Sequence, residues 1–155
     1  MKLIITTIAS LIYLLTSTAP GQETQTNDHI KHYKKGNINC VIFPSNYIYE
    51  YYTFLNTTNQ RFTPTIDEVK KAEAYLEEKF YLEYLLKYRR QYFGYIDKQG
   101  NKILYINCFW SENSFHHKEW KETIVVVDDG GDHYWQIKFN LKTGGFFDLS
   151  VNGEG

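Results

Sequence analysis

Cysteine, proline and methionine are scarce in this sequence, and neither sign of charge is in excess. The chain of 155 residues has two cysteines, three prolines and one methionine, and its 17 basic side chains stand against 18 acidic ones. A net charge of −1 provides no overall positive field for a phosphate backbone, which argues against a nucleic-acid-binding protein. Because 43% of the residues are hydrophobic and 17% aromatic, the composition also excludes extensive disorder and predicts one compact domain.

The longest apolar run lies at the N-terminus. Lys2 precedes an apolar stretch from Leu3 to Leu15, and small residues follow it, which is the pattern of a secretory signal peptide. We expect removal of residues 1–21, so that Gln22 begins the mature chain. The stretch is shorter than the roughly 20 residues that cross a bilayer, so no membrane span is expected after processing. The sequence therefore predicts an exported protein, either periplasmic or extracellular.

Export affects how the two cysteines are interpreted. Cys40 and Cys108 would both enter an oxidising compartment, where a single disulfide between them would stabilise the fold by roughly 4 kcal/mol in the chain-entropy model. Two buried thiols that act as small apolar side chains are the other interpretation. The sequence leaves both open, because it does not show how close the two Cα atoms come.

The mature chain is predicted to divide into a leader and one domain. Residues 22–37 are polar and are expected to form a flexible leader, and residues 38–155 form the domain. The apolar run 39–43 predicts a first strand. Residues 45–63 fit either a short helix or an aromatic strand, followed by a loop in which Asn56-Thr57-Thr58 matches a glycosylation acceptor.

The clearest helix signal begins at Thr65. Its hydroxyl can accept a hydrogen bond from the backbone N–H of Glu68, whose side chain can reach back to the amide of Thr65. Apolar residues then recur every three or four positions, at Ile66, Val69, Ala72, Leu76 and Phe80. The opposite face is charged, with Asp67, Lys70, Lys71, Glu73, Glu77 and Glu78. The pattern predicts an amphipathic helix that ends between Phe80 and Lys87.

After this helix the hydrophobic period changes from 3.6 to 2, which predicts an antiparallel meander. The expected strands are Tyr88–Ile96, Lys102–Trp110, Thr123–Val127, His133–Leu141 and a last strand with Phe147, Leu149 and Val151 facing the core. Turns rich in Gly and Asp separate several of these segments.

The order of elements predicts an α+β fold, with one main helix packed on a curved antiparallel β-meander of four to six strands. This order, β-α-β-β-β-β, resembles that of cystatin-like folds, but the Gln-x-Val-x-Gly loop of cystatins is absent, so no protease inhibition is implied. The chain also resembles small exported proteins of Bacteroidetes-type bacteria in its Gly21-Gln22 exit, its Arg90–Ile96 strand and its closing Val151–Glu154. That resemblance implies no activity.

Three clusters of reactive side chains can be weighed. His116, His117 and Glu119 could bind a metal, but adjacent histidines on an extended chain point apart, so a solvated loop is expected. Asp128, Asp129, Asp132 and His133 offer oxygens to calcium, but Asp and Gly are also what a tight turn needs, and the turn is expected. A Cys40 or Cys108 nucleophile served by a histidine lacks any local signature. We therefore expect no catalytic residue, metal or cofactor.

The aromatic surplus remains, with 14 Tyr, 10 Phe and 3 Trp. Such side chains suit interfaces, and the expected ligand-binding residues are Trp110, Trp120, His116, His117 and Tyr92. The leading hypothesis is a small exported non-enzymatic binding protein whose sheet surface meets a protein or envelope partner. The alternative is a hydrolase or lyase with its site in the hollow of the fold, with His133, Asp148 or Glu119 at its mouth.

Overall fold

The computed structural model describes residues 29–48 and 60–154. The strands are β1 (Lys31–Lys35), β2 (Ile38–Ile42), β3 (Arg61–Phe62), β4 (Tyr88–Ile96), β5 (Lys102–Trp110), β6 (Tyr134–Asn140) and β7 (Phe146–Val151). The helices are α2 (Ile66–Lys79) and α3 (Leu82–Leu85), with two 3₁₀ helices, η1 (Ser111–Phe115) and η2 (Gly131–His133). The α+β class with one main helix is confirmed, but the described sheet has seven strands rather than four to six.

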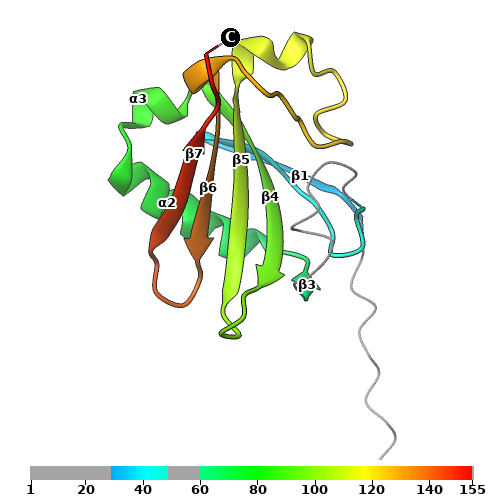
Figure 1. The fold of residues 1–155 in the computed structure, drawn as a ribbon, viewed down its shortest axis with the longest axis vertical. Helices are drawn as coiled ribbons and strands as arrows, with labels where there is room; N and C mark the ends of the chain where they lie inside the picture. The colour runs from blue at the N-terminus through cyan, green and yellow to red at the C-terminus, as the bar shows by residue number, and fades with distance from the viewer. Residues whose placement is uncertain (1–28, 49–59, 155) are drawn as a thin grey trace, which may run out of the picture.

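The strands form one mostly antiparallel sheet in the order β1-β2-β4-β5-β6-β7, and β3 pairs with β4 (Figure 1). The exception is the parallel pair β2–β4, in which Cys40 lies opposite Arg90. Parallel neighbours need a long crossover, and α2 lies on the connection between these two strands. The cystatin-like order is not confirmed.

The first strand lies inside the segment that the sequence predicted to be a leader. β1 pairs antiparallel with β2, from Lys31 opposite Ile42 to Lys35 opposite Ile38. Gly36 has a φ of 55° in the turn between them, a backbone conformation that favours glycine. The prediction that order begins near Ile38 was therefore wrong, because an edge strand rich in lysine has the composition of a polar leader. The expected signal peptide lies outside the described residues, as does the 49–59 part of the ambiguous segment.

The capping box at the start of α2 is confirmed. The amide of Glu68 donates to the Thr65 hydroxyl at 3.2 Å, and the Thr65 amide donates to the Glu68 carboxylate at 2.9 Å. The last helical residue is Lys79 and Phe80 is the C-cap, at the start of the predicted range, and α3 follows. Glu73 differs from the prediction, because it is buried on the face that packs against the sheet.

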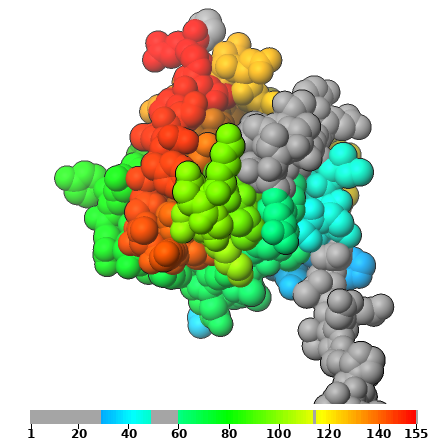
Figure 2. Space-filling view, turned by 60° about the horizontal axis from the view of Figure 1, so that its bottom comes forward, coloured from blue at the N-terminus to red at the C-terminus, as the bar shows by residue number. Residues whose placement is uncertain are grey.

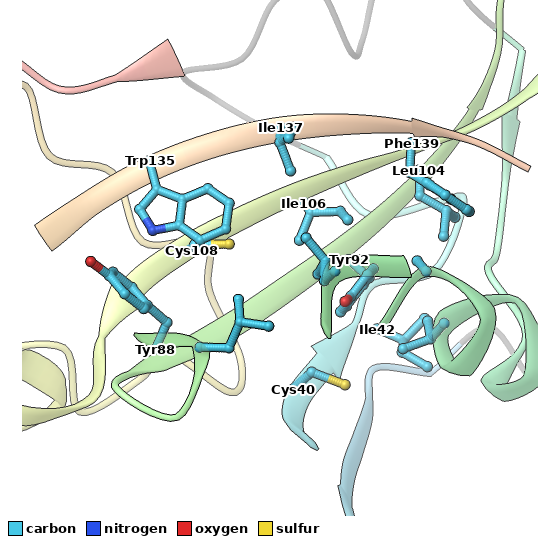
Figure 3. Close-up of a cluster of buried hydrophobic side chains, with 14 of the residues drawn as sticks. Cys40, Ile42, Tyr88, Tyr92, Leu104, Ile106, Cys108, Trp135, Ile137 and Phe139 are labelled. Atoms are coloured by element: carbon cyan, nitrogen blue, oxygen red, sulfur yellow. The ribbon is translucent and has the colours of Figure 1, made fainter. Parts of the chain in front are cut away.

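Side chains pack on both faces of the sheet. Between the sheet and α2 lies a helix-side core, part of which Figure 3 shows; it includes Val69, Leu76, Leu104, Ile106, Trp135, Ile137 and Phe139. On the opposite face a second core includes Val41, Phe43, Phe93, Ile103, Phe109, Trp120 and Val125. In Figure 1, α2 runs behind the strands, whereas the yellow segment after β5 lies toward β1. The sheet is therefore the middle of three layers.

The last strand does not point its apolar residues into the core. Phe147, Leu149 and Val151 are 39%, 53% and 51% exposed. β7 is the outer strand, and a bulge between its pairings with Gln136 and Lys138 shifts its register. Asp148 at this irregularity has a φ of 51°. The bulge and the edge position explain why alternation alone misplaced these side chains.

At the end of the molecule shown in Figure 2, the β4–β5 turn (yellow-green) lies beside the β6–β7 turn (orange). Gly100 in the first turn has a φ of 80°, as the predicted hairpin requires. Among the helices of the described residues, none combines the length and the apolar character needed to cross a bilayer.

Candidate functional site

A groove of about 910 Å³ lies beside the second core. One wall is formed by Tyr47 and Ile48 after β2. The floor and the other wall are formed by residues of the long β5–η2 connection, namely 115–120, 123–126 and Asp128. The groove therefore brings together two segments that are far apart in the sequence.

Two buried amides of the sheet hold the floor of this groove. Gln91 donates through Nε2 to the carbonyls of Trp120 and Thr123, each at 2.7 Å, and its Oε1 accepts from the Val125 amide at 2.9 Å. Asn107 donates to the Val125 carbonyl at 2.8 Å and to Gln91 Oε1 at 3.0 Å. These bonds satisfy backbone groups that would otherwise be buried without partners.

The same bonds correct a prediction. No strand forms at 123–127, which runs as irregular backbone over the sheet. Its consecutive β-branched residues resemble those of a strand, but they serve to cover the second core, where Val125 is buried and Ile124 and Val127 are partly buried. Side-chain amides replace the neighbouring strand that the prediction required.

The rim of the groove exposes apolar side chains. Ile48 is 80% exposed, Phe115 is 63% exposed and Val126 is 37% exposed. The Phe115 ring packs against the ring of His116 with the centroids 3.7 Å apart. Burial of these side chains by a ligand would be favourable, because it would remove apolar surface from water.

His117 attaches the groove wall to β6. Its Nε2 lies 3.0 Å from the hydroxyl of Tyr134, which also accepts a hydrogen bond from Asn113 at 3.3 Å. The edge of the imidazole meets the ring of Phe109. Burial, together with the neighbouring His116, lowers the pKa of His117 below its usual value. The neutral imidazole is therefore the form that this site favours.

Trp120 lies at the floor rather than on the surface, since it is almost fully buried. The Arg89 guanidinium lies 5.1 Å from its ring centroid, and the Lys121 amine lies 5.7 Å from it. The ring of His32, from β1, approaches it edge-on at 5.6 Å. Three cationic or basic groups thus surround one indole.

Of the five expected ligand-binding residues, the structure brings three together in the groove: His116, His117 and Trp120. Tyr92 is buried in the helix-side core, where its hydroxyl donates to Glu73 at 2.7 Å. Trp110 lies outside both the groove and the helix-side core. Its ring centroid is 3.6 Å from that of His133, and the Lys87 amine lies over its ring. The five residues therefore do not share one surface.

The two cysteines are free and buried. Both lie opposite Arg90, Cys40 from β2 and Cys108 from β5, so two strand spacings, about 10 Å, separate their Cα atoms. That exceeds the limit of about 7 Å for a disulfide. Figure 3 shows the two sulfur atoms well apart. Burial raises the pKa of Cys108 and raises that of Cys40 to about 12, which disfavours a thiolate nucleophile.

The Asp128, Asp129, Asp132 and His133 cluster belongs to a turn, as expected. Gly130 and Gly131 have positive φ values in the 128–132 segment, as a turn requires, and Asn152 donates to the carbonyls of Val127 and Asp129. Within the described residues, no three His, Cys, Asp or Glu side chains are grouped so that they could hold a metal ion. The space between sheet and helix, which the hydrolase or lyase alternative would use, is occupied by the helix-side core.

Sequence reasoning missed the residues that define the groove. Ile48 and Val126 lie in irregular segments and Phe115 ends the short 3₁₀ helix η1, so no hydrophobic periodicity marks these residues as a surface. Gln91 and Asn107 carried a signal, since each is a polar residue in the middle of an aromatic and branched strand. Such a residue needs a buried partner, and here that partner is the backbone of the groove wall.

Compared with known proteins, the chain matches no protein-family model, no curated protein and no solved structure. The function proposed next therefore depends on the geometry of the groove.

Proposed function

We propose that this chain is a small exported, non-enzymatic binding protein that holds an extended segment of a partner protein in its groove. The observation that supports this proposal is the ring of exposed apolar side chains, Ile48, Phe115 and Val126, around a floor fixed by buried hydrogen bonds. These hydrogen bonds order the floor of the groove before a partner binds, which lowers the entropic cost of binding.

A protein segment fits this groove better than a small molecule does. Pockets for small molecules bury most of the ligand's surface, whereas here the side chains of the rim remain largely in solvent. Along the wall, the charged residues Lys118 and Glu119 lie between the apolar residue Phe115 and the apolar segment 124–126. Apolar anchors between charged neighbours are typical of protein interfaces.

Export is the second part of the proposal. The predicted signal peptide supports a periplasmic or extracellular location, in which the partner would be another exported or envelope protein. The resemblance to cystatin-like element order and to exported Bacteroidetes-type proteins stays a prediction.

The test is a selection of random peptides displayed on phage against the wild-type mature protein. The binding of the selected peptides is then measured by calorimetry for the variant Ile48→Ser/Phe115→Ser. We expect affinity to fall by about tenfold or more, because the two largest exposed anchors are lost. Leu149→Ser is the matched control, since it removes an exposed apolar side chain from strand β7, which does not line the groove.

Two results would contradict the proposal. One is that no peptide is enriched above a heat-denatured sample of the same protein. The other is that Leu149→Ser weakens binding as much as the groove variant does, which would place the interface at the β7 edge.

A further inference from the structure

The charge of this near-neutral chain is unevenly distributed. Residues 29–37 carry three lysines and two histidines and no acidic side chain. Most of them belong to β1, which among the described strands lies at one edge of the sheet and pairs with β2 alone. Lysine on an edge strand commonly prevents aggregation, and it also creates a local positive field that attracts anions.

Arg89 extends this positive region toward the groove. Its guanidinium lies over the ring of Trp120, which also lines the groove. Its Nε is buried without a hydrogen-bond partner, and Arg89 forms no ion pair within the described residues. Glu119 and Glu122 lie on the same loop as Trp120, but neither forms an ion pair with Arg89 or Lys121 there. Burial lowers the pKa of Arg89, so the charge is partly desolvated and uncompensated.

The neighbouring arginine shows what a satisfied guanidinium looks like in this fold. Arg90 points to the other face, where it donates to the Glu73 carboxylate at 2.6 Å and to three backbone carbonyls. Arg89 carries the same guanidinium one residue earlier, but no carboxylate among the described residues pairs with it. A buried donor without a partner is costly, and such a group often marks a place where a ligand completes the site.

We propose that Arg89, with Lys121 and His32 around Trp120, binds a carboxylate of the partner, and that the partner segment is therefore an acidic extended peptide. This inference rests on the proposed function and names the chemistry of the occupant. A planar guanidinium can donate two parallel hydrogen bonds to a carboxylate, and the position of the Arg89 guanidinium over the Trp120 ring limits its orientations.

The sheet edge favours a peptide over a sulfated sugar. Among the described strands, none pairs with the outer side of β1, so its backbone donors and acceptors there can pair with an extended peptide as an added strand. The side chains of Lys31, Lys34 and Lys35 would then lie beside its acidic residues. A sugar chain could use the charges but not the backbone pairing.

The test uses three probes on the mature protein, measured by calorimetry at low salt. They are a short peptide of alternating glutamate and valine, the same peptide with glutamine in place of glutamate, and a heparin-derived oligosaccharide. The variant is Arg89→Met, which keeps an apolar stem on Trp120. The control is Lys98→Met, which removes an exposed charge from the distant β4–β5 turn.

We expect the glutamate peptide to bind wild type and Lys98→Met equally, and Arg89→Met about tenfold more weakly. The glutamine peptide should bind wild type about tenfold more weakly than the glutamate peptide does. The inference is overturned if Arg89→Met binds the glutamate peptide as wild type does, if the peptide does not bind wild type, or if only the oligosaccharide depends on Arg89.

The two proposals fail separately. If phage-selected peptides depend on Ile48 and Phe115 but not on Arg89, the groove function stands and the acidic-partner inference falls. If the glutamate peptide depends on Arg89 while no selected peptide depends on the groove residues, the carboxylate site stands without the groove.

Discussion

The Glu73 carboxylate of α2 receives two hydrogen bonds from β4 on a single oxygen: Arg90 Nε donates at 2.6 Å, and the Tyr92 hydroxyl donates at 2.7 Å. All three side chains are buried. Burial raises the pKa of Tyr92, and the neighbouring Glu73 carboxylate raises it further. Burial alone would lower the pKa of Arg90, but Glu73 and Tyr92 outweigh it, so the guanidinium stays charged.

Removal of the carboxylate should be one of the most damaging single changes in this fold. We expect Glu73→Ala to lower the free energy of unfolding by about 3–5 kcal/mol, because it leaves Arg90 buried without its counter-charge. Glu77→Ala, on the exposed face of the same helix, is the control and should cost far less. Urea unfolding measures both. Equal losses for the two variants would show that the buried pair does not hold the helix on the sheet.

Replacement of both partners should be milder than removal of one. In Glu73→Leu/Arg90→Met no charge is buried, and apolar side chains of similar size fill the space, so much of the stability lost in Glu73→Ala should return. Urea unfolding of the double variant checks this. A double variant as unstable as Glu73→Ala would mean that the lost hydrogen bonds, those of Arg90 to the backbone and of Tyr92 to Glu73, matter more than the buried charge.

Both thiols should be unreactive until the protein unfolds. Burial raises the pKa of Cys40 to about 12, so at about pH 8 almost no thiolate forms and the sulfur is also inaccessible. A thiol-specific chromogenic reagent should titrate two thiols in urea and almost none in the native protein. Mass spectrometry of oxidised samples should show the same intact mass with and without reductant. A mass difference of two hydrogens would demonstrate a disulfide and contradict the two-strand separation.

Local signals in the sequence predicted the parts of the fold that local interactions determine. The Thr65 capping box and the alternation of β4, β5 and β6 are properties of neighbouring residues, and they are confirmed. The errors have a common cause. β1, β7 and the 123–127 segment depend on what lies beside them in space, which neither periodicity nor composition reports.

The candidate site was predictable only in part for the same reason. His116, His117 and Trp120 were singled out by residue type, and the groove contains all three. Tyr92 was misplaced because an aromatic strand covered on both faces has no outward side. Arg89 was overlooked because its missing partner is visible only once the surroundings of its guanidinium are known.

Substitution of Gly94 by any residue with a side chain should destabilise the fold. A Cβ there would lie 2.5 Å from the carbonyl oxygen of Phe62 and 2.8 Å from its ring, which pack β3 against β4. We expect Gly94→Ala to lower the free energy of unfolding by about 1–3 kcal/mol, because β3 must move. Gly153→Ala, with no atom within 4 Å of the added Cβ, should have little effect. Similar unfolding midpoints for the two variants would contradict the close approach.

Stability should fall on acidification through His117. Because its pKa is lowered in the folded state, the unfolded chain binds more protons below the ordinary value of 6.5. Its contribution to stability is therefore fully present above pH 6.5 and is lost as the pH falls through the lower folded value. His117→Gln should flatten this part of the urea-unfolding profile, whereas exposed His29→Gln should not. Identical profiles for wild type and His117→Gln would refute the assignment.

Nuclear magnetic resonance mapping of a phage-selected peptide on the isotopically labelled mature protein tests the groove most directly. The largest amide shifts are expected at Tyr47, Ile48 and residues 115–128, with the indole N–H of Trp120 also affected. Shifts concentrated on β7 or α3, with the groove amides unchanged, would show that this protein binds its partner elsewhere.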